Sequence, residues 1–142
     1  MLYPLLFDAG QLPEGEITDI SECSDGVLLV YNTGMIVCLN RDTNKINWDL
    51  KEISKELGNN KYETFSFFVD KENDIWIYSP SGLWIYNPAE KKWQKKLRDL
   101  INRQSRSAVL SVAQDLQGRI WIGREHDGVN ILNKSTGEIK TL

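Results

Sequence analysis

Residues 115–133 read DLQGRIWIGREHDGVNILN: a polar turn, a short strand around a tryptophan, a turn that contains glycine, and a second short strand that ends in asparagine. Residues 70–87 repeat this order as DKENDIWIYSPSGLWIYN. A looser copy, GVLLVYNTGMIVCLN, occupies residues 26–40. Three copies of one phrase in 142 residues indicate a repeat architecture, in which each unit buries its apolar face against a neighbour.

The spacing of the copies indicates the type of repeat. Leu29, Trp76 and Trp121 occupy the same slot, so the copies are 47 and 45 residues apart. A period in the forties with several short strands per copy is typical of β-propeller blades. We therefore predict an all-β fold, a partial β-propeller of about three four-stranded antiparallel blades within a single fragment, residues 1–142. The blades are expected at residues 17–50, 65–97 and 109–142, with insertions at residues 51–64 and 98–108.

The second copy shows all four expected strands. They are rich in aliphatic and aromatic residues, as strands that pack on both faces require, and are expected at residues 65–69, 75–78, 83–86 and from Lys92 onward. In all three copies a residue that tolerates a left-handed backbone precedes the second strand: Gly26, Asn73 and Gly118.

The segments outside the copies carry weaker signals. Residues 50–58 have apolar side chains at helical spacing and a glycine at the end, so we expect a short helix there, and a weaker one at residues 97–101. Residues 3–7 are a candidate strand of a preceding blade.

The charge balance excludes one class of partner. The chain has 17 Lys or Arg and 20 Asp or Glu, so it lacks the basic footprint of a nucleic-acid-binding protein. The local run KKWQKK, residues 91–96, is interpreted as an edge strand kept soluble by lysines, with polyanion binding as the alternative. No apolar stretch of about 18 residues is present, so this segment is not expected to insert into a membrane.

The chain has two cysteines, Cys23 and Cys38. In the blade alignment they lie on strands that are not neighbours, and such strands are about 9–10 Å apart, beyond the reach of a disulfide. We expect both thiols to be reduced and packed in the interior.

Seven positions are interpreted as structural because the repeat fixes them. Asp70 and Asp115 are expected to accept hydrogen bonds from the backbone N–H groups of their own turns. Trp76 and Trp121 are expected to stack between neighbouring blades. The remaining structural positions are glycines at turns: Gly82, Gly118 and Gly128.

The turn that contains Arg124, His126 and Asp127 is the best candidate for ligand binding, because it is the most polar loop between strands and loops on a rigid scaffold often carry function. The matching loops are residues 31–33 and 79–81. Trp84 is a further candidate, for stacking on a sugar, since its slot is not aromatic in the other copies.

Motifs for catalysis or cofactor binding are not found in the sequence. It has one histidine, no Gly-x-Ser-x-Gly elbow, no Cys/His metal spacing and no Gly-rich phosphate loop. The acidic turn at residues 70–74 lacks the following Gly and the distal Glu of a Ca²⁺ loop. We expect no cofactor and no metal.

With its Asp115, Gly118, Ile120-Trp-Ile-Gly123 and Gly128 pattern, the chain resembles the two-component regulator propeller repeat over roughly residues 17–142. The second copy departs from the pattern at Asn73 and Tyr78. The first departs further, at Cys23, Leu29 and Tyr31.

The resemblance implies a non-enzymatic sensor module. Such repeats form the periplasmic sensor region of hybrid two-component histidine kinases of Bacteroidetes, which respond to glycan-related signals, so an oligosaccharide is the implied ligand. Two alternatives stay open: a propeller scaffold for protein interaction, and a fragment of a propeller lyase or glycosidase. An open array also leaves apolar blade faces bare, so we expect self-association, detectable by light scattering.

Overall fold

The computed structural model describes residues 12–57 and 64–142. The chain divides into two compact units, Met1–Thr64 and Phe65–Leu142, called here the first and the second unit. The candidate strand at residues 3–7 lies outside the described residues.

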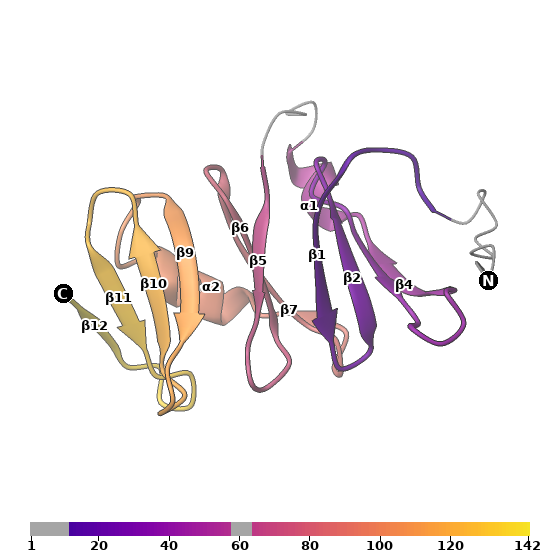
Figure 1. Cartoon of the computed structure of the whole chain (residues 1–142). Helices are drawn as coiled ribbons and strands as arrows, with labels where there is room; N and C mark the ends of the chain where they lie inside the picture. Colours follow the sequence, from indigo (N-terminus) through magenta and orange to yellow (C-terminus); the bar gives the residue numbers. More distant parts are fainter. Residues whose placement is uncertain (1–11, 58–63) are drawn as a thin grey trace. The chain divides into compact units, whose positions relative to one another are not determined.

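The first unit holds one antiparallel sheet and a short helix (Figure 1). Its strands follow each other in chain order across the sheet, and they are β1 (Ile17–Cys23), β2 (Gly26–Tyr31), β3 (Ile36–Leu39) and β4 (Ile46–Leu50). The helix α1 (Glu52–Leu57) follows. One face of the sheet carries a core of Leu29, Tyr31, Met35, Val37 and Leu39.

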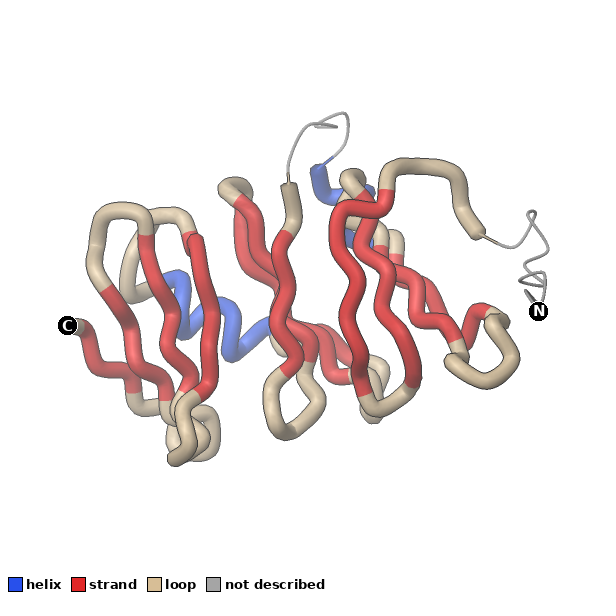
Figure 2. Tube along the Cα trace, viewed as in Figure 1, coloured by secondary structure: helices blue, strands red, loops and turns tan. Residues whose placement is uncertain are grey.

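The second unit holds two such sheets and the helix between them. The first sheet has the order β5 (Ser66–Val69), β6 (Ile75–Ser79), β7 (Gly82–Asn87) and β8 (Lys92–Trp93). The second has the order β9 (Val109–Gln114), β10 (Ile120–Arg124), β11 (Val129–Leu132) and β12 (Ile139–Thr141). The helix α2 (Lys95–Asn102) connects them and lies behind the strands in the view of Figure 2.

One core joins the three parts of the second unit. Trp76 is fully buried in it, as its repeated position predicts, together with Ile101 of α2 and with Ile120 and Ile122 of the next sheet. Leu97 and Leu100 of the helix pack against the same cluster. Helix and sheets therefore hold the connecting loops of this unit in fixed positions.

The all-β prediction of three four-stranded antiparallel blades is confirmed. The turn chemistry explains why the strands reverse where they do. Asn73 has a φ of 69° and Gly118 a φ of 83°, both in the region that few residues other than Gly and Asn adopt. Both predicted helices are present as well.

The prediction of an edge strand through residues 91–96 is wrong in its second half. Strand β8 ends at Trp93, and Lys95 and Lys96 form the first turn of α2. The helix begins two residues before the predicted start at Leu97. Its residues Leu97, Leu100 and Ile101 form one apolar face that the core covers.

Both cysteines are free and buried. Burial raises the pKa of Cys38 to about 12, and a hydrogen bond and charge interaction with Cys23 add to this effect. Two reduced, packed thiols are what the strand spacing predicts.

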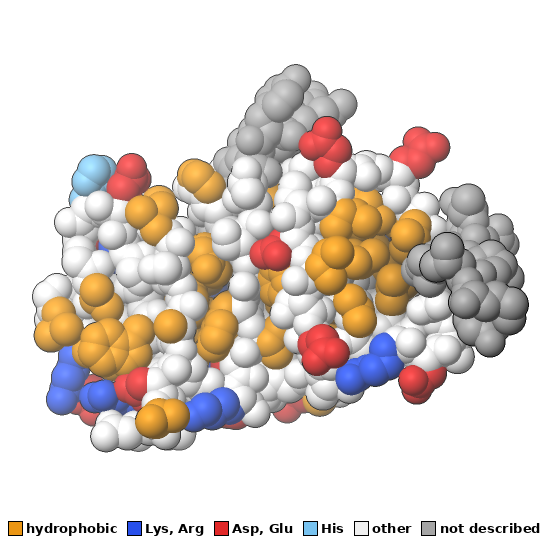
Figure 3. Space-filling view, in the orientation of Figure 1, with side chains coloured by type: hydrophobic (Ala, Val, Ile, Leu, Met, Phe, Trp, Pro, Cys, Tyr) orange, Lys and Arg blue, Asp and Glu red, His pale blue; other side chains and the backbone are white. Residues whose placement is uncertain are grey.

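Apolar side chains gather over β1 and β2 on the face of the first unit that Figure 3 shows. On β1, Ile17 is 41% and Ile20 62% exposed. The predicted self-association would act on such surfaces, and it stays a prediction. No helix in the described ranges is long and apolar enough to cross a membrane.

Candidate functional site

Asp70 organises the turn between β5 and β6. Its Oδ1 accepts hydrogen bonds from the backbone N–H groups of Glu72 and Asp74, each at 3.0 Å. Its Oδ2 accepts a third from the indole Nε1–H of Trp76 at 2.8 Å. The carboxylate thus fixes both the turn and the tryptophan on the following strand. The bonds from the backbone of the turn are the predicted ones, whereas the bond from the indole is an additional finding.

Asp115 repeats this geometry between β9 and β10. Its Oδ1 accepts from the backbone N–H groups of Gln117 and Arg119, at 2.9 and 3.0 Å, and its Oδ2 from Nε1–H of Trp121 at 2.8 Å. Arg119 also donates from Nε to Oδ2 at 2.7 Å. The bond from Trp121 and those from Arg119 and Gln117 hold the pKa of Asp115 well below its usual range. Both aspartates serve the fold.

Lys134 links the two sheets of the second unit by ion pairs. Lys134, in the turn between β11 and β12, donates to Oδ2 of Asp70 and to Oδ2 of Asp74, both at 2.7 Å, and lies 3.4 Å from Glu72. The side chains of Lys134, Asp70 and Asp74 are 9%, 0% and 4% exposed. Burial alone would lower the pKa of Lys134, but the bonds to Asp70 and Asp74 outweigh it and raise the pKa.

A pocket of about 270 Å³ opens at the other end of this unit. Its walls are the β6–β7 turn, the second half of α2, the loop before β9, and the end of β10. All charged residues that line it are arginines, namely Arg98, Arg106 and Arg124, and we call it the arginine pocket. Serines of both loops supply the remaining polar side chains, together with Asn102. The β6–β7 turn, residues 79–81, is one of the loops at which we expected a ligand.

Arg124 is 8% exposed and points into the protein. It donates from Nε to Oδ1 of Asn130 at 2.9 Å and from its terminal nitrogens to the carbonyls of Ser107 and Ile101, at 3.0 and 2.9 Å. Burial lowers the pKa of Arg124, and the charge of Asp127 opposes this. The residue therefore ties β10 to β11, to the loop and to the end of α2, while it also lines the pocket.

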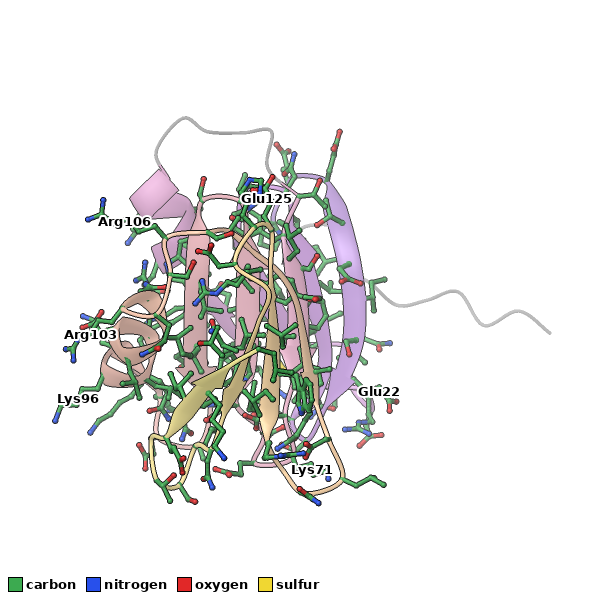
Figure 4. All side chains as sticks on the ribbon, turned by 90° about the vertical axis from the view of Figure 1, so that its left-hand side faces the viewer. Glu22, Lys71, Lys96, Arg103, Arg106 and Glu125 are labelled. Carbon is green, nitrogen blue, oxygen red and sulfur yellow. The ribbon has the colours of Figure 1, made fainter. Side chains whose placement is uncertain are left out.

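The other two residues predicted in this loop lie apart from Arg124. The side chain of His126 is 78% exposed and its Nε2 is 3.9 Å from Oε1 of Glu125. Glu125 lies at the tip of the second unit in Figure 4. The carboxylate of Asp127 accepts a hydrogen bond from Oγ of Ser105. Arg124 thus faces the interior, His126 faces solvent, and Asp127 braces the neighbouring loop.

Trp84 is 4% exposed, with Phe65 at 6.0 Å between ring centroids. The guanidinium of Arg98 lies over its ring at 5.3 Å, which is a cation–π geometry. A sugar could stack on this ring only after Arg98 moved. In this conformation the tryptophan positions Arg98 at the pocket instead.

Sequence reasoning missed Arg98 and Arg106. A signal was present: residues 91–106 contain seven Lys or Arg and a single acid, Asp99, in a chain whose net charge is −3. The overall balance hid this local excess. Among the described residues, no three His, Cys, Asp or Glu side chains gather as they would to hold a metal ion.

Two solved structures from B. thetaiotaomicron resemble the chain. One is the extracellular domain of a protein assigned as a hybrid two component system, with a TM-score of 0.63 and 17% identity over 95% of this chain. The other is the extracellular domain of a protein assigned as a one component system, with a TM-score of 0.59 and 18% identity over 89% of this chain. The chain spans 16% of the length of each.

The sequence matches no family profile and no curated protein. At such low identity the structural likeness concerns the fold alone. The chain shares the fold of a part of these extracellular domains.

Proposed function

We propose that this chain is a non-enzymatic recognition segment in the extracytoplasmic sensor region of a two-component signalling protein. One observation carries the proposal: the consecutive four-stranded sheets match the extracellular domain of a hybrid two component system over 95% of the chain, with a TM-score of 0.63. The repeat pattern around Trp121 supports it independently, because it resembles the propeller repeat of such sensors.

The use of the carboxylates favours recognition over catalysis. Asp70 and Asp115, which the repeat places in register, each accept two backbone N–H groups and an indole. A general acid or base must reach a substrate proton, and carboxylates so engaged hold the fold instead. The side chain of His126 is exposed beside Glu125, and the hydroxyl of Ser107 accepts a hydrogen bond from the backbone N–H of His126, which is not the serine–imidazole bond of a nucleophilic triad.

The proposed signal is a glycan-related molecule that meets the protein outside the cytoplasm. Loops at one end of the sheets, which carry the arginine pocket, offer the polar side chains and the hollow that recognition of a hydrated ligand needs. The sheets provide a rigid scaffold that holds these loops in place. The signal of ligand binding would be transmitted by other parts of the parent protein.

The coding sequence around this segment tests the proposal. We expect further copies of the repeat, a membrane-spanning helix, and a histidine kinase or DNA-binding regulator in the same reading frame. In cells that carry the whole gene with a reporter, a glycan mixture should raise reporter output. A reading frame without membrane-spanning and signalling segments would contradict the proposal.

A further inference from the structure

We propose that the arginine pocket binds the carboxylate of an acidic saccharide. The anion part stands on the pocket itself, and the saccharide part rests on the proposed function. Three features of the second unit carry the inference: an incompletely neutralised buried cation, two further guanidinium groups at the pocket, and a basic helix beside it.

The buried cation is Arg124. Its three hydrogen bonds go to neutral acceptors, the amide oxygen of Asn130 and two backbone carbonyls. Among the described residues, no carboxylate lies within 4.0 Å of its guanidinium, and the closest acid that influences it, Asp127, is hydrogen-bonded to Ser105. A buried charge is costly unless an opposite charge balances it. An anion in the pocket would supply that balance.

The guanidinium of Arg124 also keeps donors in reserve. Arginine has five N–H groups in a planar fork, and the three bonds to Asn130, Ser107 and Ile101 use three of them. Such forks match the paired oxygens of carboxylates and sulfates.

Arg98 and Arg106 reach the same pocket from α2 and from the loop before β9. Arg98 is held in place by the ring of Trp84, and neither residue has an acidic partner within 4.0 Å among the described residues. Serine residues of the β6–β7 turn and of the loop line the remaining wall, where hydroxyl groups suit a sugar ring. A volume of about 270 Å³ accommodates about one sugar unit, near the lower end for ligand pockets.

The surroundings add a long-range field. Residues 91–106 carry seven of the chain's 17 basic residues and one acid. In Figure 4, Lys96, Arg103 and Arg106 project on the same side, away from the sheets. A basic rim of this kind raises the local concentration of anions and speeds their association.

The Lys134 cluster provides the internal contrast. There a buried cation meets two buried carboxylates at 2.7 Å, so its charge is balanced within the protein. The arginine pocket has the opposite composition, with cations and neutral acceptors only. This difference is why we assign the ligand to the pocket and not to the cluster.

The test is a titration of the whole chain with sodium glucuronate, sodium sulfate and glucose at constant ionic strength, followed by NMR or calorimetry. We expect saturable binding of glucuronate and no saturation with glucose. Arg98→Gln should weaken glucuronate binding at least tenfold, and Arg106→Gln about threefold because that side chain is exposed. Arg103→Gln, on the same basic side but outside the pocket lining, is the matched control and should change affinity less than twofold. Arg124 is not substituted in this test, because its three hydrogen bonds stabilise the fold.

Three results would overturn the inference. If glucuronate does not bind saturably, the pocket is not a binding site for it. If Arg103→Gln weakens glucuronate binding as much as Arg98→Gln does, the binding is diffuse attraction by a basic surface. Saturable binding of sulfate without glucuronate would overturn the saccharide assignment. The proposed function fails separately: if the reading frame lacks signalling segments while Arg98→Gln still weakens glucuronate binding, the pocket assignment stands without the sensor.

Discussion

The turns at Asp70 and Asp115 have the same hydrogen-bond pattern, but the negative charge of the aspartate is neutralised by a different cation in each. In each, the aspartate accepts two backbone N–H groups and one indole N–H, at distances that agree within 0.1 Å. The difference lies four residues further on. Arg119 donates to Asp115 within its own turn, whereas Asp74 adds a second carboxylate beside Asp70.

This single position decides where the neutralising cation comes from. Because Asp74 replaces a cation, the Asp70 turn draws on Lys134, which is 64 residues from Asp70 in the chain and belongs to the next sheet. The carboxylate of Asp70 therefore draws its cation from the next blade, while the carboxylate of Asp115 finds its cation within its own turn. A contact to the backbone also joins the two turns, since Lys71 donates from Nζ to the carbonyl of Asp115 at 3.1 Å. In a repeat protein such interface contacts add directly to the stability of neighbouring units.

Lys134→Met should have the largest effect, a loss of about 3–5 kcal/mol in the free energy of unfolding, because it leaves Asp70 and Asp74 buried without a cation. Urea denaturation followed by circular dichroism measures it. Lys140→Met, an exposed lysine on β12, is the control and should cost less than about 0.5 kcal/mol.

A second variant distinguishes lost charge balance from lost packing. Asp74→Asn combined with Lys134→Met removes one of the two uncompensated carboxylates and should recover part of the stability. If the double variant is as unstable as the sum of the single variants, the two residues are not coupled and the interpretation of the turn as a bridge between blades is wrong.

Replacing the tryptophan of the Asp70 turn should cost more unfolding free energy than replacing the tryptophan of the Asp115 turn. Trp76→Phe removes a fully buried hydrogen bond to a carboxylate and part of the core between the sheets, so we expect a loss of about 2–3 kcal/mol. Trp121→Phe removes an equivalent bond at a half-buried site and should cost about 1 kcal/mol. Equal losses, measured by urea denaturation, would show that burial does not separate the two copies.

Much of this could be predicted from the sequence because it is local. The strands, the left-handed residues Asn73 and Gly118, and the bonds from each aspartate to its own turn follow from patterns within a few residues. The bridge from Lys134 could not be predicted, since its partners lie on another blade and the same slot in the second copy holds Pro88.

The candidate site shows the same limit. Loop polarity pointed to Arg124, His126 and Asp127, but only the structure shows that Arg124 turns inward to a pocket while His126 faces solvent. Arg98 and Arg106 join that pocket from an inserted helix that lies outside the repeat. Repeat patterns say little about insertions, because their packing depends on the core that they cover.

The two turns should also differ in how their contribution to stability depends on pH. The lowered pKa of Asp115 means that its carboxylate stabilises the fold fully above its unfolded value of about 4, and that this stabilisation is lost as the pH falls from there toward the folded value. Burial raises the pKa of Asp74, so its titration acts with the opposite sign.

Asp115→Asn isolates the Asp115 contribution. The difference in unfolding free energy between the native chain and Asp115→Asn should be constant above about pH 5 and should shrink below about pH 4. Urea denaturation at about pH 7, 5, 4 and 3 gives the profile. A difference that stays constant down to pH 3 would show that the carboxylate charge does not act in this turn.

The smallest expected effect tests whether the backbones of the two turns are interchangeable. Gly118 has a φ of 83° in the slot where Asn73 has 69°, and a Cβ at Gly118 would meet only Nε2 of Gln114 at 4.0 Å. The cost of a side chain there is therefore conformational and not steric.

Gly118→Ala should lose about 1 kcal/mol of unfolding free energy, because alanine resists a left-handed backbone. Gly118→Asn should lose about half of that or less, since asparagine tolerates this conformation. Denaturation midpoints in urea measure both. Equal losses would mean that the asparagine at residue 73 serves its side-chain contacts and not its backbone angle.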